Sequence, residues 1–212
     1  MKALPDRIKL WIGLALSLGL GSLPFPVWDH ELIDVTHMLG NELIYWALVA
    51  MTLVYVIGVE CRPLASIGFR RPTFADVAAG LAVGIATLAG LWLLYAVVLP
   101  ALHLSEEQQV EQLRTAPTWW LAASVVRAGV SEEVLFRGYP IERLQAWTRR
   151  RSIAFGGPLV LFTLAHVGPW GWAHLIVAGF GGLTLTVLYV WRRNLWANIL
   201  AHCLVDGIAV LS

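Results

Sequence analysis

The chain has 212 residues, of which 58% are hydrophobic and 14% are charged, and its formal net charge is only +1. Soluble domains carry roughly 25% charged residues, so this depletion along the whole chain predicts a polytopic membrane protein. The near-neutral charge offers no strongly basic surface, and no nucleic acid is expected as a partner. Cys61 and Cys203 lie far apart, so we expect neither a disulfide framework nor a zinc knuckle.

Seven stretches are candidate membrane helices, since a span takes about 20 largely apolar residues. The candidates are residues 8–27, 42–59, 74–99, 118–136, 153–167, 171–191 and 195–211. The first follows three basic residues as a signal peptide would, but no clean small-residue cleavage site appears, so we expect a retained helix. The sequence therefore predicts an all-α polytopic bundle of about seven transmembrane helices in the lipid bilayer, forming a single domain over residues 1–212.

The loop charges alternate along the chain, and Lys and Arg concentrate on the cytoplasmic side of a membrane. The N-terminus and the even-numbered loops are basic, with Arg62, Arg70 and Arg71, then Arg143, Arg149, Arg150 and Arg151, then Arg192 and Arg193. The first and third loops are poor in bases, with Asp29, Glu31 and Asp34, then Glu106, Glu107, Glu111 and only Arg114. This alternation predicts seven spans, with the N-terminus in the cytoplasm and the C-terminus outside.

Six ionisable residues stand out inside the apolar stretches, where each costs at least a few kcal/mol and usually marks a site. They are Glu132, Glu133 and Arg137 in the fourth candidate, His166 in the fifth, and His202 and Asp206 in the seventh. Arg127 is expected to serve as a counter-charge, and His174 to lie near a loop end with no special role.

The spacing of these residues divides them into pairs. Glu133 and Arg137 are four residues apart, so they can form an ion pair on one helix face. Glu132 projects about 100° away from Glu133 and is left free to face a cavity. His202 and Asp206 are also four residues apart, and the carboxylate can orient the imidazole or fix its tautomer.

The depth of the three candidate groups depends on where the fifth helix begins. At 1.5 Å per residue, Glu132 lies roughly 10 Å and His202 about 12 Å from the cytoplasmic side. His166 would lie about 20 Å deep if the helix began with the apolar run. A helix that begins only after Gly157 and Pro158 brings His166 to the same level, and this is the start that we predict.

A carboxylate and two histidines in a partly dry cavity can support two kinds of chemistry. The carboxylate can act as a general base on water while an imidazole donates to a developing oxyanion. Alternatively, Glu132, His166 and His202 can bind a metal such as zinc and leave a position open for water. The zinc-protease pattern H-E-x-x-H and the serine-hydrolase pattern G-x-S-x-G are both absent from the sequence.

Three short motifs together resemble the CPBP family of intramembrane proteases, also called the CAAX protease or Abi family. EEVLFRG at residues 132–138 matches the family pattern E-E-x-x-F-R-G, FTLAH at 162–166 matches F-x-x-x-H, and HCLVD at 202–206 matches H-x-x-x-N/D. The resemblance covers roughly residues 118–212. It implies a catalytic core at residues 117–212, in the last four helices, preceded by N-terminal helices and loops at residues 1–116.

The resemblance also implies a role for each matched residue. Glu132 would activate the attacking water with assistance from His166, and His202 with Asp206 would stabilise the oxyanion. Glu133 and Arg137 would support these groups. The implied protein is an intramembrane endopeptidase of a bacterial plasma membrane that cleaves a membrane-associated substrate of a prenylated or bacteriocin-type kind. No cofactor is expected, with zinc as the alternative, and the oligomeric state is open.

Two other functions fit the same polar groups. A non-catalytic bacteriocin-immunity or membrane-binding protein would retain the motifs without using them for hydrolysis. A proton-coupled transporter would use Glu132 and His166 as relay groups, but the two-fold repeats common in transporters are not found in the sequence.

Asp206 stands where the prenyl-processing branch of the family carries Asn, which bears on the substrate rather than on the fold.

Overall fold

The computed structural model describes residues 4–23, 35–105 and 115–211, and every regular element in these ranges is a helix, which confirms the all-α prediction. The N-terminal elements are α1 (Asp6–Leu14), the π-helical η1 (Ala15–Gly19), α2 (Val35–Val54), the π-helical η2 (Tyr55–Val59), the 3₁₀ helix η3 (Leu64–Ile67), α3 (Phe74–Leu93), the π-helical η4 (Leu94–Val98) and α4 (Leu99–Ala101). The C-terminal elements are α6 (Thr118–Glu132), the π-helical η5 (Glu133–Gly138), α7 (Tyr139–Thr148), the π-helical η6 (Ser152–Gly156), α8 (Gly157–Ala165), α9 (Val167–Trp170), α10 (His174–Arg192) and α11 (Leu195–Leu211).

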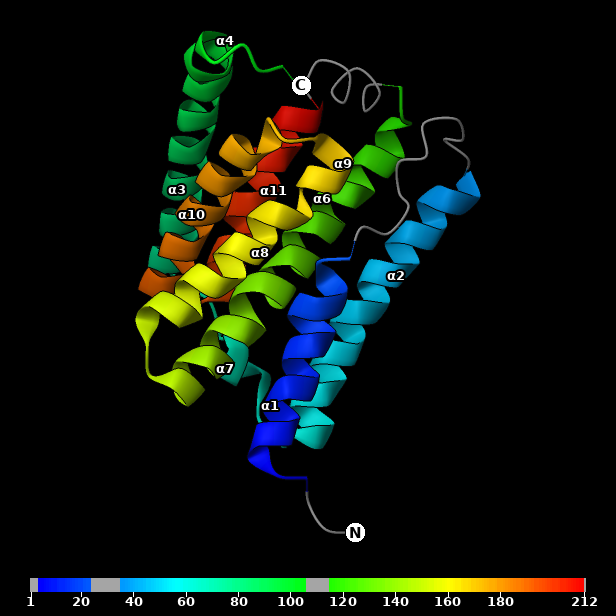
Figure 1. The fold of residues 1–212 in the computed structure, drawn as a ribbon, viewed down its shortest axis with the longest axis vertical. Coiled ribbons are helices and arrows are strands. Elements are labelled where there is room, and N and C mark those ends of the chain that lie inside the picture. The colour runs from blue at the N-terminus through cyan, green and yellow to red at the C-terminus, as the bar shows by residue number, and fades with distance from the viewer. Residues whose placement is uncertain (1–3, 24–34, 106–114, 212) are drawn as a thin grey trace.

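The helices form one bundle in which α6, α8, α10 and α11 lie between α3 on one side and α1 with α2 on the other (Figure 1). Helix α11 packs against α3 and α6, α10 packs against α8 and α3, and α2 packs against α6. The last four long helices therefore surround a common interior, and the N-terminal helices cover it from two sides.

Glycines set the closest helix contacts around α11. Gly80 of α3 faces the backbone of α11, and a Cβ added to Gly80 would lie 2.6 Å from the carbonyl oxygen of Ala197. Gly129 of α6 faces the side chain of Cys203 on α11, and a Cβ added to Gly129 would overlap its Sγ. Small residues at such crossings let membrane helices approach closely. The contact at Gly129 brings the end of α6 next to the part of α11 that carries His202.

Four helices within the described residues are long and apolar enough to cross a membrane: Met38–Val59, Phe74–Ala101, Ser152–Trp170 and His174–Arg192. Helix Leu195–Leu211 is also apolar but shorter. Large apolar side chains such as Leu43 and Trp191 point outward, with 70% and 64% of their surface exposed. The chain is thus an integral membrane protein, while the count of seven spans stays a prediction.

The helix at the fourth candidate span is longer than the sequence indicated. Helix α6, η5 and α7 run on without a break, so the helix ends at Thr148 rather than at residue 136. The prediction ended where the apolar run met charged residues, but those charges are paired inside the protein. Pro140 lacks a backbone N–H, and the wider π-helical turn of η5 accommodates the proline without ending the helix.

The predicted start of the fifth helix is wrong. The helix begins with η6 before Gly157 and Pro158 and runs into α8 as one apolar segment, Ser152–Trp170. A proline in the first turns of a helix removes few hydrogen bonds, and η6 again supplies a π-helical turn next to it. His166 still reaches the level of Glu132, because it lies 14 residues after Ser152, while Glu132 lies 16 residues before Thr148, and these two helix ends are neighbours in the chain.

The predicted basic loops lie at one end of the bundle, the end that carries the start of α1 (Figure 1). Ion pairs join three of their arginines to other helices and loops. Arg192 at the end of α10 binds Asp76 at the start of α3 at 2.8 Å, and Arg193 binds Glu142 of α7 at 2.7 Å. Arg143 belongs to α7 and not to a loop, and its guanidinium binds the Glu60 carboxylate at 2.6 Å.

The residues of the two base-poor loops, Asp29, Glu31 and Asp34 and then Glu106, Glu107, Glu111 and Arg114, lie outside the described residues, as does the end of the first candidate span. The side on which the N-terminus lies therefore stays a prediction.

Candidate active site

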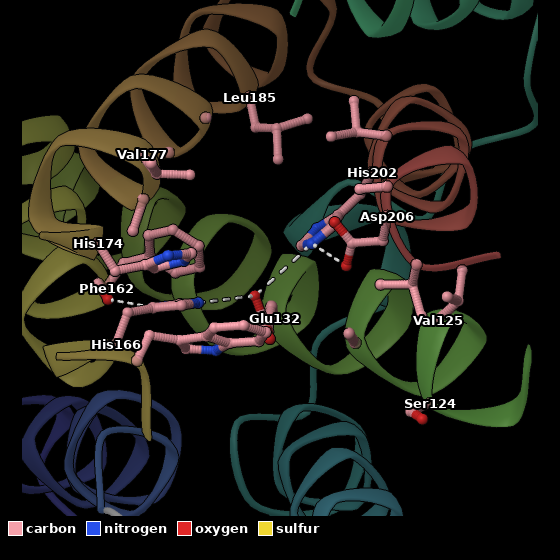
Figure 2. A pocket seen from close by; sticks show the side chains of 18 of the residues that line it. Ser124, Val125, Glu132, Phe162, His166, His174, Val177, Leu185, His202 and Asp206 are labelled. Carbon is pink, nitrogen blue, oxygen red and sulfur yellow. Dashed lines mark hydrogen bonds and ion pairs between the residues drawn. The ribbon is translucent and has the colours of Figure 1, made fainter. Parts of the chain in front are cut away.

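Three helices bring the predicted site residues to one point of the interior. Glu132 ends α6, His166 follows α8, and His202 lies in the middle of α11. The Oε2 atom of Glu132 lies 4.0 Å from Nε2 of His166 and 3.7 Å from Nε2 of His202. Figure 2 shows the Glu132 carboxylate between the two imidazoles, with Asp206 beside His202.

Glu133 is the centre of a buried polar network beneath this point. Its side chain is 0% exposed, and its carboxylate accepts from Arg137 Nη1 at 3.0 Å, Asn198 Nδ2 at 2.9 Å and His202 Nδ1 at 2.8 Å. A buried charge is tolerated only when it is paired and hydrogen-bonded. The pairing of Glu133 with Arg137 predicted from the spacing is confirmed. The bond from Glu133 to His202 joins two residues that lie 69 positions apart in sequence.

Arg137 is held from three directions. Its Nη1 binds Glu133, its Nη2 lies 3.4 Å from the carbonyl oxygen of Gly182, and its guanidinium carbon lies 4.0 Å above the centre of the Phe162 ring. A cation over an aromatic face is attracted by the ring quadrupole, and more strongly when it is buried. Arg137 therefore connects the buried network to α10 and to the helix that carries His166.

Asn198 belongs to the network although the sequence analysis did not single it out. Its Nδ2 donates to Glu133 and also to the carbonyl oxygen of Leu185 at 2.7 Å. The signal was present, because Asn198 lies four residues before His202 in NLWANILAH and so shares its helix face.

His202 is held through both ring nitrogens. Nδ1 bonds Glu133, and Nε2 lies 3.3 Å from Oδ2 of Asp206, the pair that the spacing predicted. The His202 side chain is only 6% exposed, whereas that of Asp206 is 33% exposed. The imidazole is therefore fixed from the buried side by Glu133 and from the cavity side by Asp206.

His166 is held by a hydrogen bond to the backbone of the preceding helical turn and by contacts with neighbouring aromatic rings. Its Nδ1 donates to the carbonyl oxygen of Phe162 at 2.8 Å, which leaves Nε2 as the nitrogen that faces Glu132. The ring lies 4.5 Å from that of Phe162 and 5.6 Å from that of His174, which in turn stacks on Trp170 at 4.9 Å.

His174 contacts the site (Figure 2), whereas the sequence analysis expected it near a loop end with no special role. It begins α10, after a turn whose Gly171 has a positive φ of 81°. No periodicity crosses such a turn, so the sequence carried no signal that His174 stacks on His166. Arg127, in contrast, fulfils the expected role of counter-charge, because its Nε lies 3.0 Å from Oε1 of Glu42.

Glu132, His166, His202 and Asp206 line a cavity of about 1250 Å³ that extends between α2, α3, α6, α8, α10 and α11. Most of its wall is apolar, with side chains such as Ile85, Leu88 and Trp92 from α3 and Ile208 from α11. Ligand cavities for small molecules are usually about 300–1000 Å³. The volume therefore suits a long apolar group that places one polar bond next to Glu132.

The zinc alternative requires three ligand atoms that converge on one point at about 2 Å each. Among the residues that the structure describes, no group of three His, Cys, Asp or Glu side chains is arranged to hold a metal ion. His202 is turned instead toward Glu133 and Asp206. We therefore derive no step through a metal.

Comparison with known families agrees with the motifs. Residues 114–208 match the family model for Rce1-like type II CAAX prenyl endopeptidases. The matched range contains EEVLFRG, FTLAH and HCLVD, and it confirms the resemblance that these motifs indicated. Searches among curated proteins and among solved structures found no match.

Proposed function

We propose that this chain, which over residues 114–208 matches the Rce1-like family of type II CAAX prenyl endopeptidases, cleaves a peptide bond of a membrane-associated substrate in the cavity beside Glu132. The family supports intramembrane protease activity in general. The observation that carries the specific proposal is the convergence of Glu132, His166 and His202 from three helices on one point of the cavity wall.

Glu132 and His166 hold the attacking water in this proposal. Their facing atoms lie 4.0 Å apart, too far for a direct hydrogen bond but suited to one bridging water. Because Nδ1 of His166 donates to Phe162, its Nε2 is an acceptor in the neutral ring. A water that donates to both groups presents its oxygen lone pair to the substrate, and Glu132 takes the proton as general base.

His202 stabilises the oxyanion that forms when water attacks the peptide carbonyl. With Nδ1–H donating to Glu133, a ring that is also protonated at Nε2 is an imidazolium, and its single Nε2 hydrogen is shared between Asp206 and the oxyanion. Asp206 accepts from this ring through Oδ2 and so orients it toward the cavity. Asp in place of the Asn of the prenyl-processing branch is compatible with this orienting role.

The proposed substrate is a peptide or protein anchored in the bilayer by an apolar group, such as a prenyl chain, that fills the long apolar cavity. Delivery from the cytoplasmic side of a bacterial plasma membrane fits a topology with the N-terminus inside and the C-terminus outside. No metal and no cofactor take part in the proposed reaction.

Cleavage by purified protein in liposomes tests the proposal, with a panel of prenylated and unprenylated membrane peptides. Glu132→Gln and His166→Ala are expected to abolish cleavage, and a chelator to leave it unchanged. His103→Ala, at an exposed loop histidine, is the matched control and retains full activity. Full cleavage by Glu132→Gln would contradict the mechanism, and zinc-restored activity after chelation would make the same residues metal ligands.

The same preparation separates the rival functions. Peptide binding without cleavage by the wild type would favour an immunity or binding protein. Proton-coupled uptake into the liposomes, lost in Glu132→Gln, would favour a transporter.

A further inference from the structure

A second polar position in the cavity lies on α2, away from the groups assigned above. Asn41 lines the cavity and is only 4% exposed. Neither Nδ2 nor Oδ1 of its side chain has a hydrogen-bond partner among the described residues. Buried side-chain amides are almost always hydrogen-bonded. An amide with both its donor and its acceptor unpaired, on a cavity wall, therefore points to a ligand that supplies both partners.

The surroundings of Asn41 carry no net charge. Arg127 pairs with Glu42 at 3.0 Å, and both side chains are 12% exposed. The Arg127 guanidinium also lies 4.6 Å from the centre of the Tyr45 ring, and Tyr45 is four residues from Asn41 on the same face of α2. A carboxylate placed here would find the cation already neutralised and Glu42 nearby. A neutral ligand with one donor and one acceptor fits this end of the cavity better.

The distance from Asn41 to Glu132 can be estimated along the axis of α6. Arg127 precedes Glu132 by five residues on α6, which corresponds to about 7.5 Å along the helix axis. Met38, one turn before Asn41, packs with Trp120 and Leu121 of α6, farther still from Glu132. An extended peptide advances about 3.3 Å per residue. Asn41 therefore lies roughly two to three residues from a scissile bond held at Glu132.

We infer that Asn41 binds the main-chain N–H and C=O of one substrate residue, two or three residues from the scissile bond, next to the Arg127–Glu42 pair. The Nδ2 donates to the peptide carbonyl and Oδ1 accepts from the peptide N–H. In an extended peptide the N–H and C=O of one residue point to the same side and supply both missing partners at once, whereas a terminal carboxylate supplies acceptors alone. This inference rests on the proposed function, because it takes the cavity as a peptide site.

Binding of a fluorescent prenylated peptide ending in a CAAX sequence tests the inference in the Glu132→Gln protein, where cleavage is expected to be absent. The peptide is compared with a series in which one amide at a time is replaced by an ester. We expect one ester, two or three residues from the scissile bond, to weaken binding about tenfold, the effect of one or two lost hydrogen bonds. Asn41→Leu weakens binding of the all-amide peptide by a similar factor and removes the difference between ester and amide.

Thr52→Val is the control on the same helix. Thr52 is buried, lies away from the cavity and donates only to Leu48 of its own helix, so the substitution leaves both peptides' affinities unchanged. Asn41→Leu is expected to retain the melting temperature of the parent protein, because no described hydrogen bond is lost.

The outcomes are distinct. Equal binding of ester and amide peptides at every position, or an Asn41→Leu protein that still distinguishes them, overturns the inference. Amidation of the peptide's C-terminus that weakens binding, with the effect lost in Asn41→Leu, replaces the peptide group with a carboxylate and also overturns it. If the wild type shows the Asn41 effect on binding but cleaves nothing, the proposed function fails while the binding site stands.

Discussion

Removal of Arg137 tests whether the buried network supports the site as an ion pair. In the native protein the two side chains lie 3.0 Å apart, at 1% exposure for Arg137 and 0% for Glu133. In Arg137→Met the Glu133 carboxylate therefore stays buried without this cation. At that distance the attraction is about 5.5 kcal/mol for an effective dielectric constant of 20. Measured losses for breaking one side of a buried pair are about 3–5 kcal/mol, and we expect a loss of this size in the free energy of unfolding.

A double-mutant cycle isolates the pairing from the packing. In Glu133→Gln/Arg137→Met the uncompensated charge is gone, so the double variant is expected to recover about 2 kcal/mol or more relative to the sum of the single losses. Activity does not recover with stability, because Glu133→Gln removes the buried negative charge that stabilises a His202 ring protonated on both nitrogens.

Denaturant titration of the protein in mixed micelles measures the four stabilities of the cycle. A coupling energy near zero, with losses that simply add, would refute the reasoning that the two side chains stabilise each other. The partly exposed pair Arg127–Glu42, at 12% exposure on both sides, serves for comparison and is expected to show a smaller coupling.

Three further predictions concern the site. Asp206→Asn is expected to keep at least about a tenth of the activity, because its amide oxygen still accepts from His202, whereas Asp206→Leu loses about 10²-fold in kcat; equal activity of the two variants would exclude the orienting role. Gly129→Val forces α6 away from Cys203 of α11, so cleavage and melting temperature should fall together, while wild-type values of both would contradict the close packing. Dialysis against a chelator leaves kcat unchanged if Glu132 acts on water directly, and loss reversed by zinc contradicts that.

Spacing within one helix was enough to predict the local pairs of the site. Glu133 with Arg137 and His202 with Asp206 follow from the helical period alone, since residues four apart share a face. Asn198 could have been found by the same rule. The helix that carries Glu132 was predicted too short, because charged residues ended the apolar run and their partners lie on other helices.

Contacts between helices could not be read from the period. The bond between Glu133 and His202 requires α6 and α11 to pack closely. Gly129 permits this close packing, but a glycine in the sequence does not predict which helix will approach it. The stacking of His174 on His166 depends on the turn at Gly171. Both features follow from tertiary packing, where one sequence pattern is compatible with many partners.

The two adjacent glutamates answer different physical requirements. Glu133 is completely buried and accepts three hydrogen bonds, so its carboxylate is immobilised as an anchor for His202. Glu132 is turned toward the cavity, is 19% exposed, and lies 3.7 Å or more from both imidazoles, which leaves room for water. The proposed general base must take a proton from water, whereas an anchor must not exchange protons, and one residue step along the helix is enough to give the two carboxylates these opposite surroundings.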